Sequence, residues 1–186
     1  MGRDEFCLDS RRMETLKKLI KDVPDFPKPG IVYKDFTPLL ADPAGLALAV
    51  ELMANPYRGV GVDVVVGAES RGFIFGIAVA QSLSAGFVPV RKAGKLPRAV
   101  KGVQYALEYG TDRLEMHSDA LVGKQRVLLV DDLLATGGTL EACARLVHEA
   151  APQATLVGAS VLIELGALGG IRKLGHCGRV HSVIKY

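Results

Sequence analysis

Short apolar runs that alternate with helical stretches are the feature that most limits how this chain of 186 residues can fold. Four such runs are rich in β-branched residues: VDVVVG (62–67), FVPVR (87–91), RVLLVD (126–131) and TLVGASVLI (155–163). Runs separated by helical segments are typical of βα units, in which the strands pair in parallel. The first and third runs are almost continuously apolar, as expected for strands buried on both faces. The sequence therefore predicts an α/β fold with a central, mostly parallel sheet flanked by helices.

The first 60 residues have a different pattern. Apolar residues recur on one helical face between Ser10 and Asp22, and Ser10 is a suitable N-cap, so this segment predicts a helix. The segment VPDFPKPG (23–30) predicts a stiff, extended loop, because its prolines restrict the backbone and cannot donate hydrogen bonds. The Asp-Pro pair at 42–43 predicts the start of a second helix, which runs to about Asn55.

Composition narrows the class of protein. The net charge of +3 is mild and the basic residues lie in short clusters, which favours small anionic ligands over a nucleic acid duplex. The sequence contains no run of roughly 18 apolar residues, which a membrane-spanning helix would need. The N-terminus also lacks the apolar stretch of a signal peptide. The three cysteines and four histidines show neither a disulfide framework nor metal-ligand spacing. We therefore expect a single cytoplasmic domain over residues 1–186 that binds neither membranes nor nucleic acid.

The segment VLLVDDLLATGGTL (127–140) carries the clearest functional signal. In open α/β sheets, ligands bind outside the carboxyl ends of the strands, and here a strand leads into two carboxylates and a glycine loop. Glycines let successive N–H groups face one phosphate, and the helix that follows adds its positive end. The carboxylates can accept hydrogen bonds from hydroxyls of the same ligand. The order predicts a site for ribose 5-phosphate, formed by Asp131, Asp132, Ala135, Thr136, Gly137, Gly138 and Thr139.

Neither half of that segment is specific alone, because two aspartates can simply end a strand and TGGT can simply form a turn. A nucleotide-triphosphate loop would show G-x-x-x-x-G-K-[ST], and a dinucleotide fold would show G-x-G-x-x-G. The sequence contains neither pattern at this place. The two halves in this order favour the phosphorylated sugar.

Two further segments carry groups that suit a phosphate. Ser70 and Arg71 follow the strand that ends at Gly67, just before a helix, although an arginine at a helix start is often only exposed. In RKAGKLPR, four basic residues follow a strand within eight positions: Arg91, Lys92, Lys95 and Arg98. Such a run is often a solvated face, but its position favours an anion site. Residues 93–118 carry charges, three glycines and only weak alternation, and they predict a mobile loop or a hairpin.

The segment VLLVDDLLATGGT resembles the phosphoribosyl diphosphate binding motif of the type I phosphoribosyltransferases. PDFPKPGIVYKDFTPLL, ESRGFIFG, and RKAGKLP followed by LEYG resemble, in that order, segments of the adenine phosphoribosyltransferase family, over about residues 20–170. The resemblance implies transfer of a phosphoribosyl group from phosphoribosyl diphosphate to adenine, giving AMP and pyrophosphate. It also implies a homodimer, Mg²⁺ held mainly by the substrate, a small N-terminal hood (about 20–40) and a flexible catalytic loop (about 93–118).

The same resemblance implies roles for individual residues. The catalytic carboxylate is Glu108, with Tyr109 beside it on the loop, and the Glu69–Ser70 peptide bond is expected to be cis. The residues that bind the sugar phosphate are Asp131, Asp132 and 135–139. Those that bind pyrophosphate are Ser70, Arg71, Arg91, Lys92 and Lys95. Those that bind the base are Val32, Tyr33, Lys34 and Leu165.

Two alternative functions remain open. A phosphoribosyltransferase for another purine base would keep the TGGT loop and change the base pocket, whose residues could equally belong to the core. A purine-responsive regulator with the same fold would need an added DNA-binding segment and could lack the loop glutamate. The sequence also departs from the family pattern. Arg98 follows KLP where the family usually has glycine, and GALGGIRKL (166–174) replaces a Lys-Gly-Arg-like run.

Overall fold

The computed structural model describes residues 11–106 and 111–186. They form two compact units, one that ends at Leu52 and one from Met53 to Tyr186. In the first unit, a helix over residues 11–17 precedes two antiparallel strands, β1 (Lys21–Pro24) and β2 (Val32–Asp35). Helix α2 (Thr37–Ala41) follows, and helix α3 (Pro43–Ala54) begins in this unit and ends in the next. The α3 helix was predicted almost to the residue.

The start of this unit differs from the sequence-based expectation. The first helix ends at residue 17, whereas it was predicted to reach Asp22, and residues 21–24 form strand β1. Pairing with β2 outweighs the helical pattern there, because Lys21 pairs with Asp35 and Pro24 with Val32. Pro24 is tolerated since it ends a strand in a two-stranded ribbon, where a ladder hydrogen bond can be spared. The segment 23–30 is therefore not wholly an irregular loop.

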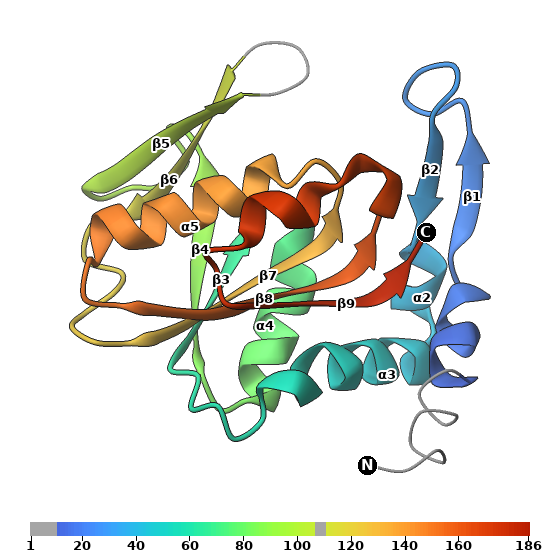
Figure 1. Cartoon of the computed structure of the whole chain (residues 1–186), viewed down its shortest axis with the longest axis horizontal. Helices are drawn as coiled ribbons and strands as arrows, with labels where there is room; N and C mark the ends of the chain where they lie inside the picture. The colour runs from blue at the N-terminus through green and yellow to red at the C-terminus, as the bar shows by residue number, and fades with distance from the viewer. Residues whose placement is uncertain (1–10, 107–110) are drawn as a thin grey trace. The chain divides into compact units, whose positions relative to one another are not determined.

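The second unit is built on a seven-stranded sheet, shown in Figure 1. Its strands are β3 (Val64–Ala68), β4 (Gly86–Lys92), β5 (Val100–Ala106), β6 (Thr111–His117), β7 (Arg126–Leu134), β8 (Thr155–Glu164) and β9 (Arg179–Lys185). They lie in the order β5-β6-β4-β3-β7-β8-β9. The five strands from β4 to β9 in this order pair in parallel, while β6 is antiparallel to both β4 and β5. The predicted mostly parallel sheet is confirmed, and residues 100–106 and 111–117 form the hairpin that was one of two expectations for 93–118.

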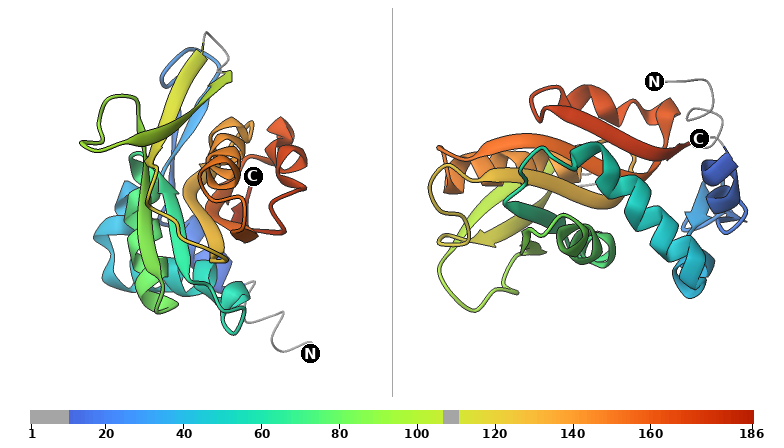
Figure 2. Two further views of the ribbon diagram at one scale, coloured as in Figure 1. Left: turned by 90° about the vertical axis from the view of Figure 1, so that its left-hand side faces the viewer. Right: turned by 90° about the horizontal axis from the view of Figure 1, so that it is seen from below.

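Two helices connect the central strands in opposite directions. Helix α4 (Arg71–Ser82) leads from β3 to β4, toward one edge of the sheet. Helix α5 (Gly138–Ala150) leads from β7 to β8, toward the opposite edge. Because such crossovers are right-handed, the two helices cover opposite faces of the sheet, as Figure 2 shows. The strand order thus reverses between β3 and β7. At such a reversal the carboxyl ends of the strands open a crevice that commonly binds ligands.

The centre of the sheet is the most deeply buried part of the unit. Every residue of β3 is buried, and Leu128, Leu129 and Val130 of β7 are fully buried. Burying one such leucine contributes about 1.5 to 3 kcal/mol. Helix α5 adds apolar residues to the same core, which also includes the thiols of Cys143 and Cys177. Strands β3 and β7 therefore form a well-packed base for the loops at their carboxyl ends.

The described part of this unit also contains three short 3-10 helices: η1 (Asn55–Tyr57), η2 (Gly166–Leu168) and η3 (Gly170–Leu174). The last two lie between β8 and β9, in the glycine-rich segment that departs from the family pattern. Among the described residues, no helix has both the length and the apolar character needed to span a bilayer.

Candidate active site

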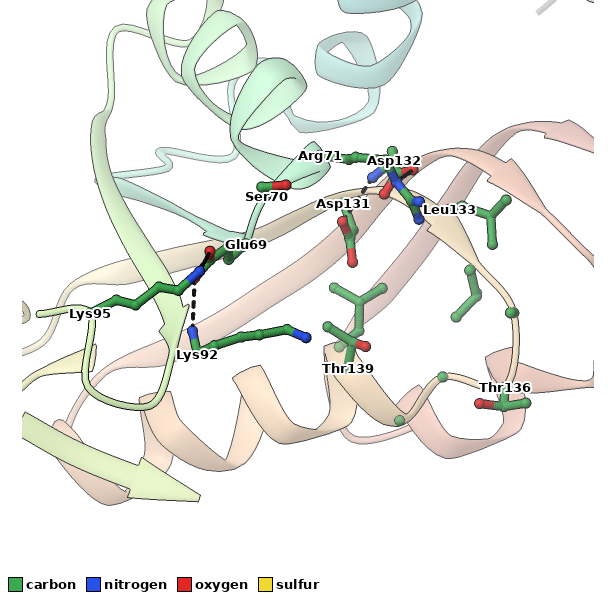
Figure 3. A pocket seen from close by; sticks show the side chains of 15 residues that line it. Glu69, Ser70, Arg71, Lys92, Lys95, Asp131, Asp132, Leu133, Thr136 and Thr139 are labelled. Atoms are coloured by element: carbon green, nitrogen blue, oxygen red, sulfur yellow. Dashed lines mark hydrogen bonds and ion pairs between the residues drawn. The ribbon is translucent and has the colours of Figure 1, made fainter. Parts of the chain in front are cut away.

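A cavity of about 600 Å³ opens at the carboxyl ends of β3, β4 and β7. It joins three segments that lie far apart in the sequence, as Figure 3 shows. The residues that line it are Glu69, Ser70, Arg71, Lys92, Lys95 and the continuous run from Asp131 to Leu140. The structure therefore brings together all seven residues predicted for the sugar phosphate and four of the five predicted for pyrophosphate.

The glycine loop presents the start of α5 to this cavity. Gly137 has φ of +80°, a left-handed conformation that strongly favours glycine, and it precedes the first residue of the helix. No side chain of the described residues caps this helix start by a hydrogen bond to its backbone. The first N–H groups of an α-helix have no partner within the helix and carry partial positive charge. They are therefore suited to bind an anion.

The two carboxylates that precede the loop are both buried at the end of β7 but have different partners. Asp132 Oδ2 accepts a hydrogen bond from Arg71 Nε at 2.6 Å, whereas Asp131 Oδ1 accepts one from the Asp132 backbone N–H at 3.0 Å. A Cβ placed on Gly72 would lie 2.6 Å from Asp131 Oδ1, so α4 approaches this carboxylate closely. Burial raises the pKa of Asp131 well above its usual range, and the charge of Asp132 adds to the rise.

Ser70 and Arg71 are placed by the connection between β3 and α4. Ser70 is the N-cap residue of α4, and the Glu69–Ser70 peptide bond is cis, which confirms the expectation. The Arg71 side chain is half exposed and reaches across to Asp132, so one cation spans the gap between the ends of β3 and β7 (Figure 3). A ligand in the cavity meets a hydroxyl and a guanidinium on this wall.

The basic segment that begins at the end of β4 is held by Glu69, which was not predicted as a site residue. Glu69 Oε2 accepts a hydrogen bond from the Lys92 backbone N–H at 2.9 Å, and Glu69 Oε1 accepts one from Lys95 Nζ (Figure 3). Arg91 Nε lies 3.4 Å from the same Oε2. Burial alone would raise the pKa of Glu69, but the hydrogen bonds from Lys95 and Lys92 lower it overall. In the sequence, the position of Glu69 beside Ser70, at the end of a buried strand, could have indicated that it belongs to the site.

A second carboxylate supports the same turn. Glu115 of β6 accepts a hydrogen bond from the Gly94 N–H at 2.9 Å, which lowers its pKa. Arg91, predicted to bind pyrophosphate, is not among the described residues that line the cavity, and its guanidinium also donates to Lys95 O at 3.2 Å. Arg98, which departs from the family pattern, forms an exposed ion pair with Asp119.

The residues predicted for the base belong to separate units. Val32, Tyr33 and Lys34 lie on β2, where the Tyr33 ring packs edge-on against Phe26 with ring centroids 5.3 Å apart. Leu165 follows β8 in the second unit, and its N–H donates to Leu134 O at 2.9 Å, beside the start of the glycine loop. Glu108 and Tyr109 lie outside the described residues.

The metal-binding capacity of the cavity is limited. Within residues 11–106 and 111–186, no three His, Cys, Asp or Glu side chains form a group that could hold a metal ion. Asp131 and Asp132 nevertheless line the cavity beside the glycine loop. Mg²⁺ is commonly bound by one or two carboxylates together with substrate phosphates and water. The residues present therefore suit a Mg²⁺ ion that is carried mainly by a phosphorylated ligand.

Comparison with known proteins extends these observations. A model of the phosphoribosyl transferase domain matches residues 37–180. The adenine phosphoribosyltransferase of Acaryochloris marina is 54% identical over 171 residues, which are 92% of this chain and 99% of that protein.

Solved structures give a similar result. The adenine phosphoribosyltransferase from Rhodothermus marinus is 50% identical with a TM-score of 0.89, and the match covers 95% of this chain and 99% of that one. The Saccharomyces cerevisiae enzyme, solved with adenine and an imino-altritol bisphosphate, is 35% identical with a TM-score of 0.87. That match covers 94% of this chain and 99% of the yeast chain.

Proposed function

Because this chain belongs to the adenine phosphoribosyltransferase family, we propose that it transfers the 5-phosphoribosyl group of phosphoribosyl diphosphate to adenine, giving AMP and pyrophosphate. The observation that carries the proposal is the cavity in which a glycine loop, an acidic pair and a basic segment meet. Each of these three parts suits one part of the sugar donor. The reaction is a pentosyl transfer of the kind used in purine salvage.

The 5-phosphate binds in the loop from Ala135 to Thr139. Its oxygens accept hydrogen bonds from the loop N–H groups and from the two threonine hydroxyls, next to the positive end of α5. The phosphate stays in this loop throughout the reaction, because the bond that breaks is at the other end of the sugar. The loop therefore holds the ribose while the anomeric carbon changes partner.

The acidic pair positions the ribose. Asp131 and Asp132 accept hydrogen bonds from the ribose hydroxyls, which lie between the 5-phosphate and the anomeric carbon. As the bond to pyrophosphate breaks, positive charge develops on the ribose, and nearby carboxylates stabilise it. Arg71 keeps Asp132 in place through the hydrogen bond at 2.6 Å.

The leaving pyrophosphate lies against the basic wall. Ser70, Arg71, Lys92 and Lys95 supply a hydroxyl and three cations, and Arg91 adds positive charge from behind the wall, beside Glu69. These cations offset the negative charge that grows on pyrophosphate. Mg²⁺, when bound with the substrate, neutralises part of the same charge.

The adenine-binding residues are proposed from the family resemblance. Val32, Tyr33 and Lys34 offer backbone contacts and one aromatic face, and Leu165 offers an apolar face for a flat purine. Glu108, with Tyr109 beside it, assists proton movement on the imidazole ring of adenine. Both residues lie between β5 and β6 in the sequence, and we propose that this segment also keeps water from the reacting groups.

The assembly and setting follow from the same proposal. The family match begins in the first unit and ends in the second, which supports one phosphoribosyltransferase domain. Ile74 and Ile77 are 43% and 48% exposed on α4, and an apolar pair of this kind supports a homodimer interface. Cys143 and Cys177 are free and buried, which suits the cytoplasm.

A substrate panel tests the proposed function. The purified protein is assayed for nucleotide and pyrophosphate formation from phosphoribosyl diphosphate with adenine, hypoxanthine, guanine or orotate, in Mg²⁺ and in EDTA. We expect turnover with adenine but not with the other three bases, and only in the presence of Mg²⁺. Faster turnover of another base would assign the enzyme to that base. Purine binding without turnover of any base would favour a regulator and overturn the proposal.

A further inference from the structure

The glycine-rich segment that follows Leu165 lies directly against the glycine loop. Leu165 is joined to Leu134 by a backbone hydrogen bond of 2.9 Å, and four residues later Gly169 turns the chain with φ of +63°. This turn places the buried backbone of Gly170 beside Ala135 O and the N–H of Gly137. Gly170 does not appear among the described residues that line the cavity.

The approach is so close that neither side has space for a side chain. A Cβ on Gly170 would lie 2.7 Å from Gly137 N and closer still to Ala135 O. A Cβ on Gly137 would lie 2.5 Å from Gly170 O. Cβ atoms essentially never approach other heavy atoms within 3.0 Å, and here the neighbours are backbone atoms that cannot rotate away. Two glycines that are 33 positions apart in the sequence therefore pack backbone against backbone.

We propose that Gly170 is a positioning residue for the phosphate-binding loop. Its contact holds the backbone of residues 135–137, so that their N–H groups keep the direction that a 5-phosphate requires. A side chain at this position displaces the loop and leaves the basic wall in place, because that wall is held by Glu69 and Glu115. The inference rests on the proposed function only in assigning the 5-phosphate to this loop.

The role predicts a selective loss of affinity. Ribose 5-phosphate depends on the glycine loop, whereas pyrophosphate depends on Arg71, Lys92 and Lys95. Displacing the loop weakens the binding of ribose 5-phosphate and leaves the binding of pyrophosphate unchanged. General damage to the fold would weaken both, and a residue without a positioning role would change neither.

Isothermal titration with ribose 5-phosphate, and separately with magnesium pyrophosphate, tests the inference on wild type, Gly170→Ala and Gly175→Ala. We expect Gly170→Ala to raise the Kd for ribose 5-phosphate about tenfold or more and to change that for pyrophosphate by less than about twofold. Gly175 is the matched control, because it is exposed in the same segment and a Cβ there would meet no heavy atom within 4 Å. It should bind both ligands as wild type does.

Other outcomes contradict the inference. Unchanged affinity for ribose 5-phosphate in Gly170→Ala would overturn it, as would an equal loss for both ligands. If wild type binds pyrophosphate but not ribose 5-phosphate, the assignment of the loop itself fails. Should Gly170→Ala not fold, Gly169→Ala provides a second test, because alanine is strained at its φ of +63° and so disturbs the turn that presents Gly170, while the atoms nearest to the new Cβ belong to the flexible guanidinium of Arg172. It must then show the same selective loss to a smaller degree.

Discussion

The two neighbouring carboxylates of β7 show how much surroundings matter at the scale of a single residue. Asp132 accepts a hydrogen bond from the guanidinium of Arg71, whereas Asp131 lies against Gly72 and accepts one from the Asp132 backbone N–H. Burial, with the added charge of Asp132, raises the pKa of Asp131. Two adjacent buried carboxylates ionise together only at a cost. The free protein therefore retains an unfavourable feature that a ribose hydroxyl or a cation would relieve.

Replacing Asp131 should therefore stabilise the free protein while impairing catalysis. Because the folded-state pKa is raised, the unfolded chain loses its proton first, near pH 4, and stability falls as the pH rises from there toward the folded-state pKa. Asparagine has no proton to lose in this pH range, so the stability of Asp131→Asn does not fall in this way. We expect a gain of the order of 1 kcal/mol at neutral pH that shrinks toward pH 4, together with a large loss of turnover.

Urea denaturation between pH 4 and pH 8 measures the free energy of unfolding of wild type and of Asp131→Asn, and so the gap between them. Asp119→Asn is the control, because that carboxylate is exposed and paired with Arg98 at the surface. A gap that stays constant across the range, or a destabilised Asp131→Asn variant, would show that Asp131 is ionised without cost in the free protein.

Residue types and spacing were sufficient to predict most of the cavity wall. Asp131 and Asp132 before a glycine loop, and arginine and lysine after strand ends, are informative because these groups match a phosphorylated sugar. Glu69 and Gly170 were not predicted as site residues, because their roles depend on contacts with segments about 25 and 35 positions away. The sequence shows that Glu69 lies beside Ser70 at the end of a strand, but it does not show these contacts.

At the scale of elements, two carboxylates fix the turn that follows β4. Glu69 comes from the end of β3 and Glu115 from β6, and they bind the Lys92 and Gly94 N–H groups from different sides of the turn. The side chain of Glu69 is only 9% exposed, and it accepts hydrogen bonds from both Lys92 N–H and Lys95 Nζ. The turn that carries the basic groups is therefore held in place before any ligand arrives.

The Glu69→Gln variant should loosen this basic turn. We expect the KM for phosphoribosyl diphosphate and the Kd for magnesium pyrophosphate to rise about fivefold to tenfold, while the Kd for ribose 5-phosphate stays unchanged. The lowered pKa also gives a pH signature. The stabilising effect of Glu69 is present above about pH 4 and disappears as the pH falls through its folded-state pKa, so the stability gap to wild type closes in acid.

Steady-state kinetics and titration calorimetry provide the measurements. Glu51→Gln is the control, since that residue also pairs with an arginine, at 3.1 Å from Arg12, but lies in the first unit on α3. Equal effects of the two substitutions, or a loss confined to ribose 5-phosphate, would refute the role of Glu69.

The strands were predicted where the sequence contains an apolar, β-branched run, as in β3, β4, β7 and β8. β9 was missed, although it is as buried as β4, because its sequence, RVHSVIK, mixes charged and apolar residues. β1 was missed because its pairing with β2 is not visible in a segment that reads as helix and proline loop.

At the scale of the whole molecule, the exposed face of α4 points to association. The buried face of this helix includes Phe75 and Val79, while Ile74 and Ile77 remain on the surface one turn apart. A charge in that pair would be unfavourable within an apolar interface. Ile77→Glu should therefore convert the proposed homodimer to a monomer without unfolding it.

Light scattering after size-exclusion chromatography measures this change, and circular dichroism checks the fold. Val122→Glu is the control, because Val122 is 67% exposed in a loop and lies outside α4. A wild-type protein that is monomeric at micromolar concentration, or an Ile77→Glu variant that stays dimeric, would contradict the assignment of this face.

The reversal of strand order between β3 and β7 has a further consequence. The walls of the cavity come from residues 69–71, 92, 95 and 131–140, so no single stretch of the chain forms the whole site. The site comes into existence only when β3, β4 and β7 have paired over long sequence separations, which is a slow step in folding. A ligand that binds there recognises the folded chain alone and raises its stability by mass action. The cellular supply of phosphorylated sugar would thus protect the enzyme from unfolding and proteolysis as well as feed its reaction.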